Sequence, residues 1–147
     1  MNEYRKAMEM LKRYYQSGGE IFLGDIAMAY LCRAQSKGHI SALYVLGKVL
    51  FTGIGNYAID EVKAAHCWRL AADLGSPDAM FMLGQCYEFG MGVRFDKEIA
   101  ASLYLEAAKR GKRKVRPWLE RRLDGITLAP LFLLRLQLLV GINQESC

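Results

Sequence analysis

Residues 79–111 read AMFMLGQCYEFGMGVRFDKEIAASLYLEAAKRG, and residues 42–75 read ALYVLGKVLFTGIGNYAIDEVKAAHCWRLAADLG. The two stretches align as copies of one unit, with an offset of 37 from Ala42 to Ala79 and of 36 from Trp68 to Tyr104. Self-similarity at a period of about 20–50 residues is typical of a solenoid, in which each unit buries its apolar face against its neighbours. The repeat therefore predicts the fold class: an all-α, right-handed α-solenoid of helix-turn-helix repeats.

Glycines mark the turns and contacts within each copy. Gly47 and Gly84 stand in the middle of the first helix, where glycine costs stability relative to alanine, so they predict the close approach of a neighbouring helix. The Gly-x-Gly pairs at 53–55 and 90–92 are expected to end that helix and open the turn. The second helix of each copy then closes at a glycine, Gly75 or Gly111.

Weaker copies flank the two clear ones. Residues 3–38 carry the same small and apolar spacing, with Lys12 where the mid-helix glycine would stand. Residues 112–142 read as a degenerate repeat whose apolar end, TLAPLFLLRLQLLVGI, predicts a C-terminal capping helix. The expected organisation is a single repeat domain over 1–147, with repeats at about 3–38, 39–75 and 76–111 and a capping repeat at 112–142.

Two motifs carry a resemblance to a known family. LGQCYEFGMGVRFD at 83–96 and KAAHCWRLAADLG at 63–75 resemble the Sel1-like repeat, a relative of the tetratricopeptide repeat. The resemblance covers residues 3–111 well and 112–142 poorly, and the departures are Asn56, Leu50 and Ile99. It implies a non-catalytic adaptor that binds other proteins, in settings such as signalling, secretion or protein quality control.

Catalytic and metal-binding patterns find little support in the chain. Ser-x-x-Lys, Gly-x-Ser-x-Gly, His-Glu-x-x-His and the phosphate-loop pattern are absent from the sequence, and the Gly-x-Gly pairs follow helices instead of strands. His66 and Cys67 are adjacent, so they point to different sides of a helix, and the other histidine is His39. We therefore expect no enzymatic activity, no cofactor and no metal site.

Cysteine spacing and the terminal segments bear on the compartment. The four cysteines fall at no regular repeat position, which favours free thiols in a reducing compartment and predicts a cytoplasmic protein; they are Cys32, Cys67, Cys86 and Cys147. Residues 2–17 are too charged for a signal peptide.

The apolar tail is shorter than the roughly 20 residues of a spanning helix. A buried cap is therefore favoured over a membrane span, and an outer face that forms a homodimer is a further alternative.

Charge is concentrated in one segment. Residues 109–122, KRGKRKVRPWLERR, hold eight basic residues and one acid, Glu120. Such a segment predicts an acidic protein partner, a nucleic acid or an anionic membrane surface, although a solvated collar explains it equally well. Nucleic acid is disfavoured because the rest of the chain is slightly acidic and carries no nucleic-acid motif. The proposed patch comprises Lys109, Arg110, Lys112, Arg113, Lys114 and Arg116.

The repeat register also predicts a binding groove. In tetratricopeptide-like stacks the first helix of each pair lines the concave face, where aromatic residues beside polar ones suit a docked peptide or helix. The predicted groove residues are Arg13, Tyr44, Lys48, Phe51, Phe81, Gln85, Glu88, Phe89 and Arg121. The alternative is that Tyr44 and Phe81 simply pack on adjacent helices. The sequence thus predicts a protein-binding adaptor, with a nucleic-acid or anionic-surface binder acting through 109–122 as the alternative.

Overall fold

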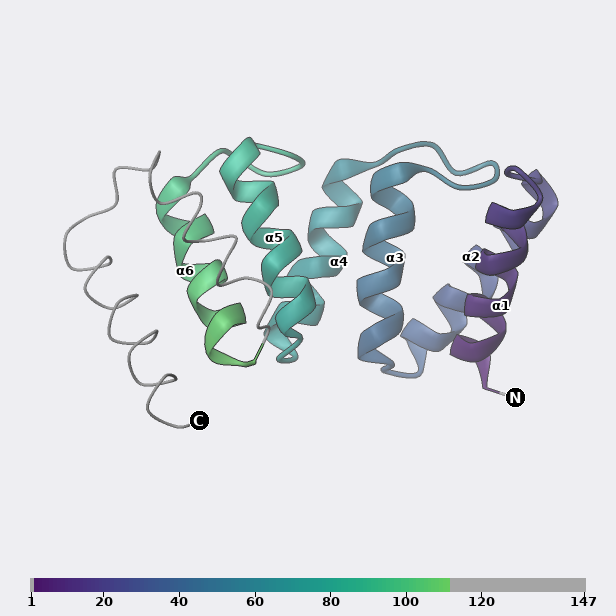
Figure 1. Ribbon diagram of the computed structural model, residues 1–147, viewed down its shortest axis with the longest axis horizontal. Coiled ribbons are helices and arrows are strands. Elements are labelled where there is room, and N and C mark those ends of the chain that lie inside the picture. The colour runs from purple at the N-terminus through teal and green to yellow at the C-terminus, as the bar shows by residue number, and fades with distance from the viewer. Residues whose placement is uncertain (1, 112–147) are drawn as a thin grey trace.

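A computed structural model describes residues 2–111 of the chain (Figure 1), and these residues fold into six helices joined by turns. The predicted capping helix and most of the basic segment lie outside the described residues. The predicted all-α solenoid is confirmed. The helices are α1 (Glu3–Gln16), α2 (Ile21–Ser36), α3 (Ile40–Thr52), α4 (Glu61–Asp73), α5 (Pro77–Phe89) and α6 (Lys97–Lys109).

The helices pack as three consecutive hairpins. The pairs α1–α2, α3–α4 and α5–α6 each form one hairpin, and neighbouring hairpins contact through α2 with α3 and through α4 with α5. In Figure 1 the turns inside the hairpins lie along the upper edge of the molecule, and the turns between hairpins lie along the lower edge. We call the upper edge the hairpin edge; it carries the C-terminal ends of the first helices and the N-terminal ends of the second helices.

Side-chain caps explain where most helices begin. The side chains of Asn2, His39, Asp60, Ser76 and Asp96 each accept a hydrogen bond from a backbone N–H in the first turn of the following helix. Such caps satisfy backbone donors that have no partner inside the helix. At the other end of α5, the cap residue adopts the left-handed conformation that glycine tolerates, as the Gly-x-Gly pattern predicts.

The mid-helix glycines lie against aromatic rings of the second helix in the same hairpin. A Cβ placed on Gly84 would lie 2.7 Å from Cε1 of Tyr104, and one on Gly47 would lie 2.7 Å from Cδ1 of Trp68. The Trp68 indole N–H also donates a hydrogen bond to the backbone carbonyl of Tyr44 at 3.1 Å. The predicted close approach is therefore confirmed, and its cause is a large ring that fills the space of the missing side chain.

The buried residues form two clusters that meet at the second hairpin, α3–α4. One cluster joins α1, α2 and α3 with Cys67 of α4, and the other joins α4, α5 and α6 with Leu43 of α3. The first hairpin packs like the later ones although Lys12 replaces the glycine, because the position of the facing ring is taken there by the smaller Leu31. Both helices of the second hairpin, α3 and α4, are shared by the two clusters and couple the first hairpin to the third.

The turns of the second and third hairpins also pack on the second helix of the preceding hairpin. Gly55 lies so close to α2 that a Cβ on Gly24 would come within 2.7 Å of its backbone nitrogen. Gly92 approaches the backbone of Glu61 in α4 in the same way, and Glu61 occupies the position in α4 that Gly24 occupies in α2. The same contact therefore sets the spacing between successive hairpins.

Candidate partner-binding surface

Tyr44 is the central residue of the predicted groove. Its ring is half-buried, and the Lys48 ammonium nitrogen lies above it, 5.4 Å from the ring centroid. Burial raises the pKa of the Tyr44 hydroxyl, and the negative charge of Asp78 at the start of α5 raises it further. The Tyr44 ring of α3 thus has a positive charge of its own helix above it and lies within electrostatic range of a negative charge at the start of α5.

Two further groove candidates pack on the rings of the second helices. The centroids of Phe51 and Trp68 are 5.7 Å apart, as are those of Phe81 and Tyr104. Both phenylalanines are half-buried, as is Gln85 on α5. Packing on the adjacent second helix therefore accounts for part of the burial of each phenylalanine. We call Tyr44, Lys48, Phe51, Phe81 and Gln85 the first-helix face.

Glu88 differs from the sequence expectation. The register predicts an exposed groove residue, whereas the structure places Glu88 in a buried position, 9% exposed, where it accepts a hydrogen bond of 2.5 Å from the Tyr104 hydroxyl. The equivalent residue in the preceding hairpin is Phe51, which packs on Trp68. An aromatic pair in one repeat is thus replaced by a hydroxyl–carboxylate pair in the next, a correlated change that a comparison of the two copies could have shown.

The remaining groove candidates lie elsewhere. Arg13 on α1 is exposed and pairs with Glu9 at 2.9 Å. Phe89 ends α5 on the hairpin edge and is half-exposed, and Arg121 lies outside the described residues. Tyr44, Phe51 and Phe81 therefore pack against one buried cluster, whereas Arg13 lies on the first hairpin.

The predicted basic patch is described at its first two residues. Lys109 and Arg110 are exposed, and the Arg110 guanidinium lies 3.8 Å from the Glu106 carboxylate. Lys112, Arg113, Lys114 and Arg116 lie outside the described residues. The patch and the nucleic-acid alternative that rests on it stay predictions.

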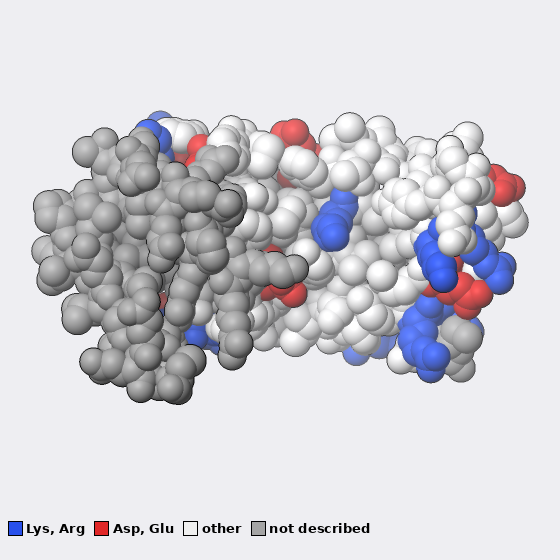
Figure 2. Space-filling model, viewed as in Figure 1, with Lys and Arg blue, Asp and Glu red and all other residues white. Residues whose placement is uncertain are grey.

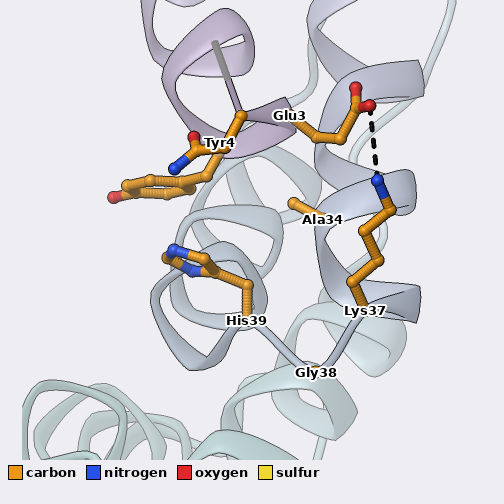
Figure 3. Close-up of a pocket in the computed structure, with 7 residues that line it drawn as sticks. Glu3, Tyr4, Ala34, Lys37, Gly38 and His39 are labelled. Carbon is orange, nitrogen blue, oxygen red and sulfur yellow. Dashed lines mark hydrogen bonds and ion pairs between the residues drawn. The ribbon is translucent and has the colours of Figure 1, made fainter.

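A cleft of about 360 Å³ opens beside the first turn of α1 (Figure 3). Its aromatic wall is Tyr4 stacked on His39, with ring centroids 4.3 Å apart. His39 Nδ1 accepts the backbone N–H of Ala42 and so caps α3. This nitrogen is therefore engaged in the fold and does not activate a nucleophile.

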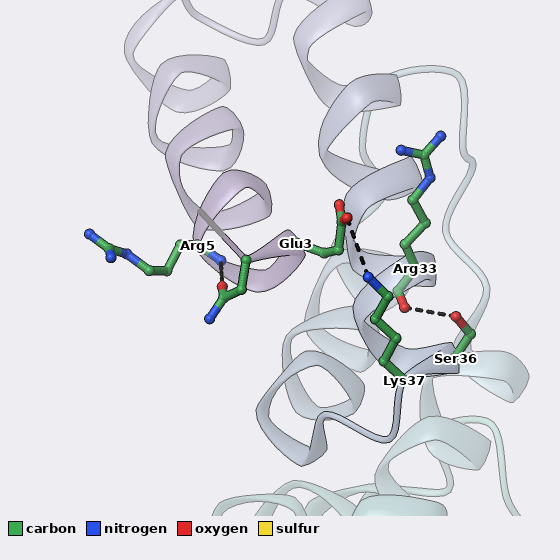
Figure 4. Close-up of polar contacts among 6 residues, drawn as sticks. Glu3, Arg5, Arg33, Ser36 and Lys37 are labelled. Carbon is green, nitrogen blue, oxygen red and sulfur yellow. Dashed lines mark hydrogen bonds and ion pairs between the residues drawn. The ribbon is translucent and has the colours of Figure 1, made fainter.

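The other polar residues of this cleft also hold helices in place. Asn2 accepts the backbone N–H of Arg5 at 2.8 Å, and the Lys37 ammonium nitrogen lies 3.5 Å from one carboxylate oxygen of Glu3 (Figure 4). The second oxygen of Glu3 is buried without a hydrogen-bond partner among the described residues. The residues that line the cleft thus cap α1 and α3, and the Glu3–Lys37 ion pair links α1 to the end of α2.

Thiols and possible metal ligands are dispersed. Cys32 is exposed on α2, whereas Cys67 and Cys86 are buried. Burial raises the pKa of the Cys86 thiol to about 11, and the charge of Glu61 adds to the shift. Within residues 2–111, no three histidine, cysteine or acidic side chains gather to hold a metal ion, and none of the described helices has the length and apolar character of a membrane span.

Comparison with known proteins matches residues 40–76 and 77–112 to the Sel1 repeat. A putative ERAD-associated E3 ubiquitin-protein ligase component of Schizosaccharomyces pombe is 35% identical over 54% of this chain and 11% of that protein. The Arabidopsis thaliana component HRD3B is 32% identical over 56% of this chain and 14% of its own length. DAP3-binding cell death enhancer 1 of Rattus norvegicus is 38% identical over 58% of this chain and 16% of its own length. The chain therefore spans less than a fifth of these relatives.

Solved structures show the same architecture. A Sel1 repeat protein from Oxalobacter formigenes superposes with a TM-score of 0.60 and 33% identity over 65% of this chain and 27% of that one. A protective antigen of uropathogenic Escherichia coli with an SLR fold gives a TM-score of 0.66 over 80% of this chain and 25% of that one, and at 24% identity it supports the fold alone. With two matched repeats and stacked helical hairpins of this kind, the chain belongs to the Sel1-repeat family.

Proposed function

We propose that this protein is a non-catalytic adaptor whose first-helix face binds a segment of a partner protein. Sel1-repeat proteins are generally protein-interaction adaptors, and two of the relatives are named as components of ERAD-associated ubiquitin ligases. The observation that carries the proposal is the half-buried Tyr44 ring, which has the Lys48 ammonium above it and lies within electrostatic range of Asp78.

This arrangement has the chemistry of a binding anchor. A ring held by its own fold loses little conformational freedom on binding, and aromatic residues dominate the energy of many interfaces. The ammonium of Lys48 and the carboxylate of Asp78 supply charges of opposite sign near the ring. The face therefore suits a partner segment with an apolar side chain flanked by polar or charged groups, docked as a peptide or a helix.

The test begins with capture of partners on the full-length protein from its native source, followed by affinity measurements with the purified partner. Tyr44→Ala should weaken binding about tenfold or more, because truncation of an interface anchor costs roughly 1–3 kcal/mol. Lys48→Ala should weaken it less, since a single exposed charge contributes little. Circular dichroism and thermal unfolding of each variant establish that the fold is intact.

A matched control is Leu74→Ala. Leu74 is 56% exposed at the C-terminal end of α4, on the opposite side of the hairpin from the turn. Unchanged affinity of this variant, together with weaker binding of Tyr44→Ala, supports the proposal. Equal affinity of the wild type and the Tyr44→Ala, Lys48→Ala double variant would exclude the first-helix face as the site.

A further inference from the structure

A histidine caps the start of α3, and histidine changes charge near neutral pH. His39 Nδ1 accepts a hydrogen bond of 3.3 Å from the backbone N–H of Ala42. The other side-chain caps of the described helices are an asparagine, a serine and two aspartates. Asparagine and serine do not titrate in this range, and aspartate keeps its charge down to about pH 4. Among the described caps, His39 is therefore the one whose acceptor is lost between about pH 5 and pH 8.

The hydrogen bond fixes which ring nitrogen carries the proton. Because Nδ1 accepts, the one proton of the neutral imidazole is on Nε2. A second proton goes onto Nδ1, the atom that faces the Ala42 N–H, and the imidazolium then has two donors and no acceptor. The backbone carbonyl of His39 also accepts the Ala42 N–H, at 3.1 Å, so this amide keeps one partner. Protonation therefore removes the side-chain cap and weakens the first turn of α3 without leaving its amide unpaired.

The positive charge of an imidazolium is also poorly placed at this helix end. The N–H groups of the first turn make the N-terminus of a helix positive, and α3 has no acidic residue in its first turn. The last turn of α2, which leads toward His39, adds the basic residue Arg33. In Figure 2 the charged side chains along the lower rim below α3 are basic on the face in view. A charge on His39 is therefore repelled by the start of its own helix.

The titratable groups around the imidazole do not offset this charge. Glu3 and Tyr4 of α1 and Lys37, which directly follows α2, line the cleft together with His39 (Figure 3). The Glu3 carboxylate pairs with Lys37 at 3.5 Å. Asp73, the last residue of α4, is exposed. Among the ion pairs and hydrogen bonds within residues 2–111, none joins a carboxylate to His39.

One contact favours the charged ring. Tyr4 stacks on His39 with ring centroids 4.3 Å apart and an angle of 21° between the ring planes. The face of an aromatic ring attracts a cation, so this stack partly opposes the effect of protonation and restricts rotation of the imidazole away from the helix. The expected response is therefore a loosening of the first turn of α3, with the ring still in the cleft.

The repeat supplies a counterpart that does not titrate. Ser76 lies 37 residues after His39, and its Oγ accepts the backbone N–H of Ala79 at 3.3 Å, as His39 Nδ1 accepts that of Ala42. Both caps lie in turns between hairpins, along the lower edge of Figure 1. We call residues 37–39, between α2 and α3, the first joint, and residues 74–76, between α4 and α5, the second joint. The two joints therefore differ in whether the cap can take up a proton.

We propose that His39 is a pH-sensitive cap that loosens the first joint when the solution becomes acidic. At a pH above the range in which histidine takes up a proton, the neutral ring caps α3, and as pH falls through that range the cap is lost. Since the cap stabilises the folded chain only with a neutral ring, its contribution is present at pH 8 and is lost toward pH 5. The proposal concerns the joint between two hairpins and does not depend on the proposed function.

Thermal unfolding of the full-length protein at pH 8 and at pH 5 tests the effect on stability. His39→Asn keeps an acceptor that does not titrate, so it should match the wild type at pH 8 and unfold about 3 °C above it at pH 5. His66→Gln is the matched control and should follow the wild type at both pH values, because His66 is the other histidine of the sequence and is exposed on α4. The same difference between the wild type and His39→Asn at both pH values overturns the proposal.

Hydrogen exchange locates the effect. After correction for the intrinsic pH dependence of exchange, amides at the start of α3 should be less protected at pH 5 than at pH 8, and those at the start of α5 should not change. The double variant His39→Asn, Ser76→His should reverse this pattern, and the wild-type comparison decides the question if that variant does not fold. Equal loss at both joints of the wild type, or no loss at the first, contradicts the proposal.

Nitrogen NMR of the histidine side chains tests the hydrogen bond itself. At pH 8 the His39 ring should carry its proton on Nε2 and none on Nδ1, since Nδ1 accepts the Ala42 N–H. The exposed His66 ring in the same spectrum is the reference. A proton on Nδ1 of His39 at pH 8 would exclude the cap and overturn the proposal.

Discussion

At the scale of single residues, the two mid-helix glycines show how one missing side chain fixes a helix pair. The Tyr104 ring occupies the space beside Gly84, and its hydroxyl donates to the buried Glu88. The Tyr104 ring is therefore fixed both by its packing beside Gly84 and by the hydrogen bond of its hydroxyl to Glu88. It cannot move aside for a larger residue without breaking a buried hydrogen bond.

Gly84→Leu should consequently destabilise the fold. Because leucine has a higher helix propensity than glycine, the substitution alone would stabilise the helix by about 1 kcal/mol. Overpacking against Tyr104 costs roughly 1–3 kcal/mol or more and should outweigh that gain. Urea unfolding should place Gly84→Leu clearly below Gln85→Leu, its half-buried neighbour on the same helix. Equal midpoints for the two variants would show that the ring yields at little cost.

Cys86 gives a prediction for alkaline pH. Burial and the charge of Glu61 raise its pKa in the folded protein to about 11 from an ordinary value of 9.0. Between these values the unfolded chain loses the thiol proton and the folded chain keeps it, so this contribution to stability is complete below pH 9 and is lost as pH rises toward 11. The thermal unfolding temperature should therefore fall as pH rises through this window, and it should fall less for Cys86→Ala. Parallel pH profiles for the two proteins would contradict this account.

At the scale of elements, capping side chains decide where the second helices begin. Asp96 accepts the backbone N–H groups of both Glu98 and Ile99 at 3.0 Å. Asp96 directly follows Phe95 and is the last residue of the turn before α6. The first hairpin differs, since Glu20 makes no side-chain cap for α2.

Asp96→Ala should lower stability by about 0.5–2 kcal/mol, because two backbone donors at the start of α6 lose their acceptor. Asp96→Asn keeps an oxygen acceptor and should retain most of that stability. Chemical denaturation of the three proteins measures the differences. Asn and Ala variants of equal stability would show that water replaces the cap without cost.

At the scale of the whole molecule, the two core clusters make stability uneven along the solenoid. Leu31 belongs to the cluster of the first hairpin and Leu83 to the cluster of the last two. In stacked repeats each unit depends on its nearest neighbours, so damage to one cluster opens that end first. The hairpin α3–α4, whose two helices each contribute to both clusters, is the coupling element.

Leu31→Ala should cost about 2–5 kcal/mol locally and speed hydrogen exchange in α1 and α2 more than in α5 and α6. Leu83→Ala should show the reverse pattern. Mass spectrometry of deuterium uptake by peptide resolves the two ends. Uniform loss of protection in both variants would show that the described residues unfold as one unit.

Much of this architecture follows from the sequence because the repeat states it twice. The glycines that end helices and the mid-helix glycines recur at fixed offsets, so each of these local inferences is checked by its copy. The first-helix candidates of α3 and α5 follow from the same register. The partner-binding role of these residues stays a prediction, since the register gives their position and says nothing of what docks there.

The tertiary structure decided what depends on contacts between helices. Glu88 is buried because the ring opposite it ends in a hydroxyl that needs an acceptor, whereas Phe51 at the same position meets an indole. The first hairpin packs without its glycine because Leu31 leaves the room that a ring would fill. Ile59 and Phe95 look like ordinary apolar residues in the sequence, and their exposure on one edge depends on how their turns pack on the preceding hairpin. Local spacing determines the repeat unit, but the surface left uncovered depends on how the units stack.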